Sequence, residues 1–128
     1  LMKKIYEANL RGQKKIEIWG SGNPRREFLY VDDLADAIYF LLQNYNSSLP
    51  INVGTSKDIS ITELAIKISK ILDHDIDITY DTKMPDGTYL KRLDTKMIND
   101  LGWRAKTSLD EGIKKTLDYC LKNNIFRI

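Results

Sequence analysis

Residues 19–33 bring together side chains that could bind a phosphorylated ligand. Trp19 precedes a Gly20–Pro24 turn, and Arg25 and Arg26 follow it. A guanidinium can hold a phosphate through two hydrogen bonds, and an indole presents a flat face and one donor. This set suits a nucleotide sugar, but it includes no nucleophile, no metal site and no proton shuttle. The sequence therefore indicates the part of an enzyme that holds the substrate, without the part that performs the reaction.

Several familiar catalytic patterns are missing. A dinucleotide-binding fingerprint needs a third glycine three residues after the second, but Arg25 stands three residues after Gly22. Pro24 and an extended segment also follow the turn, where the fingerprint requires a helix. No tyrosine has a lysine four residues later. His74 is the only histidine, which argues against His-rich metal sites and a Ser-His-Asp triad.

Length and composition indicate one domain over residues 1–128. The chain is 42% hydrophobic with a net charge of +2, too small a charge to argue for nucleic acid. No run approaches the roughly 18 apolar residues of a membrane span. A lone cysteine, Cys120, fits a reducing compartment. We therefore expect a cytoplasmic domain with no nucleic-acid or membrane partner, and the opening at Leu1 leads us to expect a piece of a longer protein.

The hydrophobic pattern predicts a mixed α/β fold of about five helices and four short strands. Helices are expected at 1–11, from Asp32 or Asp33 to Tyr45, at 61–72, from Asp94 to Gly102, and from 109 to 121. Strands are expected at 15–19, 27–31, 51–53 and 75–80, with a loop over 81–93.

Side-chain caps mark three of the helix starts. Either Asp32 or Asp33 is expected to cap the second helix. Ser60 with Glu63, and Ser108 with Glu111, have the spacing of capping boxes. In the last helix, the residues expected to face inward are Leu109, Ile113, Leu117, Cys120 and Leu121.

Five segments resemble extended short-chain dehydrogenases/reductases that act on nucleotide sugars. Residues 26–33, Arg-Glu-Phe-Leu-Tyr-Val-Asp-Asp, are similar to a stretch that many of these enzymes carry. Residues 19–24, 51–55 and 83–94, together with Leu-Gly-Trp at 101–103, narrow the resemblance to the GDP-L-fucose synthase family. The similarity covers nearly the whole chain, and Pro-Asp-Gly-Thr at 85–88 is its most specific part.

The resemblance implies a reaction and a division of labour. That family converts GDP-4-keto-6-deoxy-D-mannose to GDP-L-fucose by 3,5-epimerisation and NADPH-dependent 4-reduction. The chain would be a small mixed α/β substrate-binding domain, with NADPH bound on an N-terminal Rossmann domain outside it. None of the family's catalytic or cofactor-binding residues, and no metal ligand, can be assigned to this chain, so we expect it to be inactive alone. A homodimer of the parent is also implied, through helices outside this chain.

Position by position, the family's substrate contacts correspond to Lys4, Trp19, Arg26 and Asp86, with Lys91 a further candidate. Lys4 stands where an arginine is common, so it keeps the charge without the planar fork. The family often has Thr-Pro-Arg-Lys where this chain has Thr-Tyr-Leu-Lys at 88–91. This departure leaves the sugar and base specificity open.

From local physics alone, each of these residues also has an ordinary role. Trp19 could pack in a core at the end of its strand, Arg26 could be a surface cation beside Glu27, and Asp86 could be a turn residue. Two other functions also stay open. The chain could belong to another GDP-linked 4-keto-sugar reductase or epimerase, or it could be a truncated binding module without turnover.

Overall fold

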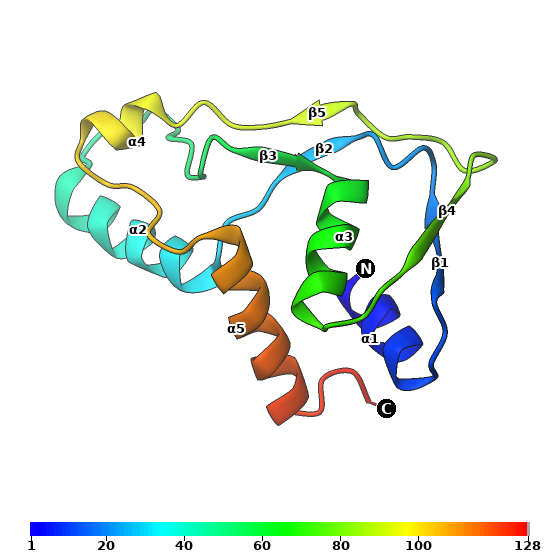
Figure 1. The fold of residues 1–128 in the computed structure, drawn as a ribbon. Coiled ribbons are helices and arrows are strands. Elements are labelled where there is room, and N and C mark those ends of the chain that lie inside the picture. Colours follow the sequence, from blue (N-terminus) through cyan, green and yellow to red (C-terminus); the bar gives the residue numbers. More distant parts are fainter. Residues whose placement is uncertain (128) are drawn as a thin grey trace.

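The computed structural model describes residues 1–127, and Figure 1 shows a mixed α/β fold, as predicted. Within this range the helices are α1 (Met2–Leu10), α2 (Val31–Asn44), α3 (Ile61–Ile71), α4 (Lys96–Asp100) and α5 (Leu109–Lys122). The strands are β1 (Lys15–Trp19), β2 (Arg25–Glu27), β3 (Asp58–Ser60), β4 (Asp77–Asp81) and β5 (Leu90–Lys91). Ile128, the last residue of the expected domain, lies outside the described residues.

The strands form two small sheets. β1 pairs in parallel with β4, from Lys15 opposite Asp77 to Trp19 opposite Asp81. β2 lies in the middle of the second sheet, antiparallel to β3 and parallel to β5. In Figure 1 this second sheet runs from the end where β1 and β4 lie toward the end where α2 and α4 lie. The loop between β4 and β5 lies beside the turn between β1 and β2, which is where the candidate site forms.

A first hydrophobic cluster supports β1. Ile16 and Ile18 alternate with exposed residues along this strand, so both face inward. They pack with the apolar faces of α1, α3 and α5, whose buried members are Ile5, Ala8, Leu64, Ala65, Ile68 and Ile113. Because Ile16 and Ile18 fix the direction of the strand, they also fix where Trp19 points.

A second cluster forms between α2 and α4. Ala37, Ile98 and Trp103 are its buried members. The indole Nε1 of Trp103 donates to Asp36 Oδ2 at 2.8 Å, which satisfies the one polar atom of this buried ring. Trp103 thus packs in this cluster shortly after α4 ends. The opposite face of α2 stays open, and Leu42 on it is 79% exposed.

The start of α2 differs from the prediction. β2 ends at Glu27 and the helix begins at Val31, with Tyr30 as an N-cap that makes no side-chain capping bond. The expectation that Asp32 or Asp33 caps the helix is therefore wrong. Asp33 is buried and accepts hydrogen bonds from the backbone of Lys106 and Thr107. Its carboxylate thus satisfies donors of a distant segment, a role that local spacing cannot reveal.

Two of the shortest strands were missed, and one expected strand is absent. Residues 51–53 are not a strand; Ile51 and Val53 instead pack against the second cluster. β3 was not predicted, and β5 lies inside the expected loop over 81–93. These strands have three and two residues, which is too short to produce a readable alternation.

The capping predictions hold fully at α3 and in part at α5. Glu63 N donates to Ser60 Oγ at 3.1 Å, and Ser60 N donates back to Glu63 Oε2 at 2.8 Å. Ser108 Oγ accepts from Glu111 N at 3.3 Å, but the Glu111 carboxylate pairs with Lys115.

The apolar stripe of α5 is shorter than predicted. Ile113 and Leu117 are buried, and Leu109 packs against the first cluster. Cys120 is half-buried and Leu121 is exposed, so the last turn of the helix does not face the core.

Candidate functional site

The turn between β1 and β2 requires two glycines. Gly20 and Gly22 have φ angles of 75° and 73°, in the left-handed region that glycine adopts without a steric penalty. A methyl group on Gly20 would overlap Asp86 Oδ1, and one on Gly22 would overlap Thr62 Oγ1. The glycines therefore let two neighbouring segments approach the turn closely.

Backbone hydrogen bonds tie this turn to α3 and β4. Ile61 N donates to Pro24 O at 3.1 Å, and Thr62 N donates to Gly22 O at 3.0 Å. These amides belong to the first turn of α3, where backbone donors have no partner within the helix. At the other end of the turn, Gly20 N donates to Asp81 O at 2.9 Å. The turn is thus fixed at both of its ends.

Trp19 points away from the core. It is the last residue of β1, opposite Asp81, and it is 68% exposed. The alternation of the strand explains this, because Ile18 before it faces inward. The alternative that Trp19 packs in the core is excluded, and its indole is available for contact.

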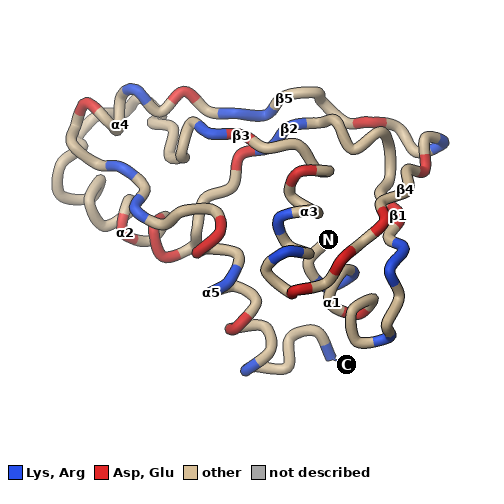
Figure 2. The backbone as a smooth tube through the Cα atoms, viewed as in Figure 1, with Lys and Arg blue, Asp and Glu red and all other residues tan. Residues whose placement is uncertain are grey.

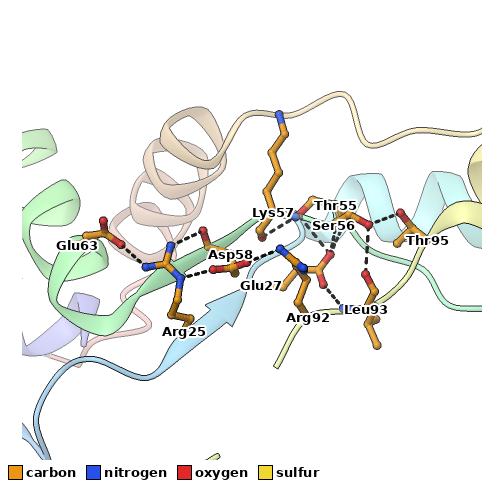
Figure 3. Close-up of polar contacts among 10 residues, drawn as sticks. All are labelled: Arg25, Glu27, Thr55, Ser56, Lys57, Asp58, Glu63, Arg92, Leu93 and Thr95. Carbon is orange, nitrogen blue, oxygen red and sulfur yellow. Dashed lines mark hydrogen bonds and ion pairs between the residues drawn. The ribbon is translucent and has the colours of Figure 1, made fainter. Parts of the chain in front are cut away.

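Arg25 is committed to a cluster of charged side chains (Figure 3). Its Nε donates to Asp58 Oδ1, and its Nη1 lies 3.3 Å from Glu63 Oε2. Arg92 Nη1 reaches the second oxygen of Asp58 at 3.0 Å. The hydrogen bond from Arg25 is the main reason that the pKa of Asp58 lies below its usual value. These pairs hold β2, β3 and the segment after β5 together.

Arg26, the next residue, makes only backbone contacts. Its Nη1 donates to the carbonyls of Arg25 and Thr88, both at 2.7 Å. No carboxylate pairs with it within residues 1–127. Lys91 lies opposite it in the parallel pairing of β2 with β5 and is exposed. Two adjacent cations therefore lack a counter-charge, which is an arrangement suited to an anionic ligand.

Asp86 is engaged with the turn. Its Oδ1 accepts from Ser21 N at 2.8 Å, and its Oδ2 accepts from Ser21 Oγ at 2.6 Å. The hydrogen bond from the Ser21 hydroxyl is the main cause that lowers the pKa of the Asp86 carboxyl, and the bond from the Ser21 amide lowers it further. The carboxylate thus stays ionised while it links the β4–β5 loop to the turn.

The structure brings four of the five predicted site residues to one edge. Trp19, Arg26, Asp86 and Lys91 surround the turn and the loop that leads into β5. Lys4 lies apart on α1, where its Nζ donates to Glu17 O at 2.7 Å, two residues before Trp19 on β1. Lys4 is therefore beside the same strand, but within residues 1–127 no hydrogen bond or ion pair joins it to the other four.

Glu27 is a structural residue that sequence reasoning missed. Its Oε1 accepts from the amides of Thr55 and Ser56, the latter at 2.7 Å, and its Oε2 accepts from Leu93 N at 2.7 Å (Figure 3). Its partners lie 28 to 66 residues away in sequence, so no local pattern marks it. In the sequence, only its place between Arg26 and Phe28 of the family motif could have drawn attention to it.

The described residues do not fit a dinucleotide or a metal. The Gly20–Gly22 turn leads into strand β2 and not into a helix, and the α3 amides of Ile61 and Thr62 that reach it already donate to Pro24 O and Gly22 O, so the turn lacks the arrangement that binds a pyrophosphate in the dinucleotide-binding manner. No group of three or more metal-binding side chains occurs in residues 1–127. Over the same range, no helix is long and apolar enough to cross a membrane.

Comparisons with known proteins agree on the family. Residues 1–54 match the NAD dependent epimerase/dehydratase family. The chain is 40% identical over 123 residues to GDP-L-fucose synthase 1 of Arabidopsis thaliana, covering 96% of this chain and 38% of that protein. It is 41% identical over 128 residues to GDP-L-colitose synthase of Yersinia pseudotuberculosis, covering 97% of this chain and 41% of that protein. The chain thus spans about two fifths of these curated relatives.

A solved structure supports the same assignment. The fold matches a GDP-L-fucose synthetase from Naegleria fowleri with a TM-score of 0.87 and 30% identity, over 97% of this chain and 38% of that one. A second structure of a Naegleria fowleri GDP-L-fucose synthetase is bound to NADP. Residues 1–54 thus match the NAD dependent epimerase/dehydratase family, and nearly the whole chain is similar to part of the GDP-L-fucose synthases.

Proposed function

We propose that this chain is the nucleotide-sugar-binding part of a 3,5-epimerase/4-reductase that acts on GDP-4-keto-6-deoxy-mannose. In this proposal a preceding Rossmann domain binds NADPH and carries the catalytic residues. The names of the relatives support the GDP-linked substrate, and the NADP-bound neighbour supports the cofactor. The chain's own part is to bind the nucleotide diphosphate and orient the sugar.

The observation that carries the proposal is the contrast between two neighbouring arginines. Arg25 is neutralised by Asp58 and Glu63, whereas Arg26 has only carbonyl partners and lies beside the exposed Lys91. A phosphate would supply the missing negative charge through a bidentate contact with the guanidinium. The exposed indole of Trp19, at the other end of the turn, would cover the base or ribose.

Such a site contributes to catalysis without touching the reacting atoms. Binding energy from the nucleotide, which does not react, can hold the keto sugar in the geometry that the reaction needs. A separate domain for nucleotide binding is consistent with the absence of an acid/base pair from the Trp19–Lys91 edge. It also gives the exposed apolar face of α2 a role, because we propose that the preceding domain packs there.

A second candidate function rests on the relatives themselves. GDP-L-colitose synthase matches this chain as well as the fucose enzyme does, at 41% identity. Tyr89 and Leu90 also replace residues that are common in the fucose family. The chain could therefore serve another GDP-linked 4-keto-sugar reductase or epimerase with the same nucleotide site. The truncated module without turnover remains as the non-enzymatic alternative.

Titration with GDP tests the binding role directly. The purified 128-residue chain is titrated with GDP and with guanosine, and tryptophan fluorescence is followed because Trp19 is exposed. We expect saturable binding of GDP, little binding of guanosine, and no saturable binding of NADPH. A chain that is folded but binds GDP no better than guanosine would refute the phosphate site.

A matched arginine serves as the control. Arg104 is exposed, has no ion pair within residues 1–127, and follows Trp103 beside the second cluster. Arg104→Ala should leave GDP affinity unchanged if Arg26 acts by its position rather than by its charge alone. Equal losses of GDP affinity in Arg26→Ala and Arg104→Ala would indicate nonspecific attraction between the cations and the phosphate.

A further inference from the structure

We infer that Asp86 is a positioning residue that acts through Ser21, fixing the turn between Trp19 and Arg26 in its binding conformation. This role differs from the direct substrate contact that the family resemblance suggests for Asp86. It deepens the proposed function and rests on it. The ligand class is the same nucleoside diphosphate.

The geometry of the Asp86 carboxylate carries the inference. Both of its oxygens accept from the same residue, Ser21, one from the amide at 2.8 Å and one from the hydroxyl at 2.6 Å. The carboxylate also lies so close to Gly20 that a Cβ there would overlap it. A carboxylate held by two donors against the backbone is built into the turn, and a sugar hydroxyl would have to compete with Ser21 for it.

Ser21 also hydrogen-bonds to the next part of the turn, so fixing Ser21 fixes that part as well. Its Oγ accepts from Asn23 N at 3.2 Å while it donates to Asp86. The ends of the turn are already fixed by α3 and β4 through Gly20, Gly22 and Pro24. Within the described residues, Asp86 is the side chain of the β4–β5 loop that fixes the middle of the turn.

The same loop also holds Arg26. Two residues after Asp86, the carbonyl of Thr88 accepts from Arg26 Nη1 at 2.7 Å. The segment 86–88 therefore contacts the turn that carries Trp19 and the guanidinium that we propose binds phosphate. If this segment detaches from Ser21, the indole and the guanidinium lose their fixed separation. Affinity then falls because the ligand must order both groups on binding.

A double-mutant cycle between Ser21 and Asp86 distinguishes positioning from direct contact. GDP affinity is measured for the full chain with Ser21→Ala, Asp86→Asn and both together. We expect each single change to weaken binding by about tenfold, and the double change to weaken it no further, because both remove the same link. If Asp86 binds the ligand directly, Ser21→Ala should leave affinity unchanged or raise it, while Asp86→Asn alone weakens it. That result would overturn the inference.

A spectroscopic measurement tests, without any ligand, whether Asp86 fixes the turn through Ser21. The chain has two tryptophans, so incorporation of fluorotryptophan gives one ¹⁹F signal for Trp19 and one for the buried Trp103. In both single variants we expect the Trp19 signal to shift or broaden while the Trp103 signal stays unchanged. Unchanged Trp19 signals in both variants would overturn the inference even if GDP affinity falls.

The controls distinguish the positioning role of Asp86 from the proposed GDP-binding function. Ser48→Ala and Asp75→Asn change exposed residues of the same types that make no side-chain hydrogen bond within residues 1–127, so both should match the wild type. If the wild-type chain binds no GDP, the proposed function fails. The effect on the Trp19 signal still decides whether Asp86 holds the turn.

Discussion

Two groups of residues border the small sheet β3-β2-β5 but differ in how their charges are satisfied. The paired-charge cluster consists of Arg25, Glu27, Asp58, Glu63 and Arg92, and each of its side chains contacts an opposite charge or several backbone amides. The turn edge consists of Trp19, Ser21, Arg26, Asp86 and Lys91, and its two cations have no carboxylate partner in residues 1–127. Figure 2 shows basic residues along both β2 and β5.

The difference shows that charge alone does not identify a binding residue. Arg25 and Arg26 are adjacent, of the same type and on the same strand, yet successive side chains of a strand point to opposite faces. One face carries Asp58, which neutralises Arg25, and the other offers Arg26 only carbonyl oxygens. The residue without a counter-charge is therefore the better candidate for binding an anion, and the paired one for stability.

The largest effect is expected in the paired-charge cluster, at Glu27. Glu27→Ala leaves the amides of Thr55, Ser56 and Leu93 without their acceptor. Hydrogen bonds to a charged group contribute about 1.5–3 kcal/mol each, so we expect a loss of about 3 kcal/mol or more in the free energy of unfolding. Urea denaturation at neutral pH measures it.

Glu27→Gln provides the graded comparison for this change. The amide keeps one acceptor oxygen but not the charge, so Glu27→Gln should lower the free energy of unfolding by less than Glu27→Ala does. Wild-type stability in Glu27→Ala would show that these backbone donors find water instead, and that the cluster does not hold the sheet together.

At the turn edge, the next largest effect is expected on binding rather than on folding. Arg26→Ala removes a charge-assisted contact of about 1.5–3 kcal/mol, so GDP affinity should fall roughly ten- to a hundredfold. Arg26→Lys should recover only part of it, because an ammonium has no fork. Stability should also fall, because the bonds from the guanidinium to the carbonyls of Arg25 and Thr88 are lost, but by less than in Glu27→Ala, since no carboxylate is left unpaired.

Arg25→Ala should show the reverse pattern. It leaves Asp58 with Arg92 as its one ion-pair partner within residues 1–127 and removes the ion pair of Glu63, so the free energy of unfolding should fall, while the folded fraction keeps its affinity for GDP. Loss of GDP affinity in Arg25→Ala at unchanged stability would show that Arg25, and not Arg26, makes the phosphate contact.

A smaller effect is expected at Ser60, which borders both groups. Ser60 caps α3 and pairs with Arg25 across the sheet, and the next two amides of α3 hold the turn. Ser60→Ala should lower the free energy of unfolding by about 0.5–2 kcal/mol. GDP affinity should stay the same, because the turn keeps its own bonds to Ile61 and Thr62. A loss of affinity without a loss of stability would place Ser60 in the binding site.

The helices were predictable because their signals are local. Helical spacing identified all five, and Ser60 with Glu63 marked the start of α3. Trp19 and Arg26 were suggested by their residue types around the Gly20–Pro24 turn, whereas Lys91 was suggested only through family resemblance. Whether each would be exposed depended on strand faces that the residue types do not reveal.

What could not be predicted was the partners of the carboxylates. Asp33 accepts from an amide 74 residues away, Glu27 from one 66 residues away, and Asp86 from Ser21 at a separation of 65. In the sequence, the first reads as a helix cap, the second as a strand residue and the third as a turn residue. Only the folded arrangement shows which donors each one satisfies.

The smallest effect is expected under mild acid, and it distinguishes the two groups once more. The hydrogen bond from Arg25 lowers the pKa of Asp58, and those from Ser21 lower the pKa of Asp86. In the unfolded chain both carboxyls titrate near pH 4, about their ordinary value. As pH falls, the unfolded state therefore takes up protons before the folded state does. The stability from these two groups is complete above about pH 5 and is lost as pH falls through their lowered folded-state values.

Asp58 should account for more of this loss than Asp86. The side chain of Asp58 is only 10% exposed and lies between two arginines, whereas Asp86 is exposed and its interactions are screened by solvent. Urea denaturation from neutral pH to about pH 3 should thus give a flatter pH dependence in Asp58→Asn than in the wild type. Asp86→Asn should flatten it less. An equal flattening by the two substitutions would mean that the turn edge contributes to folding as much as the paired-charge cluster does.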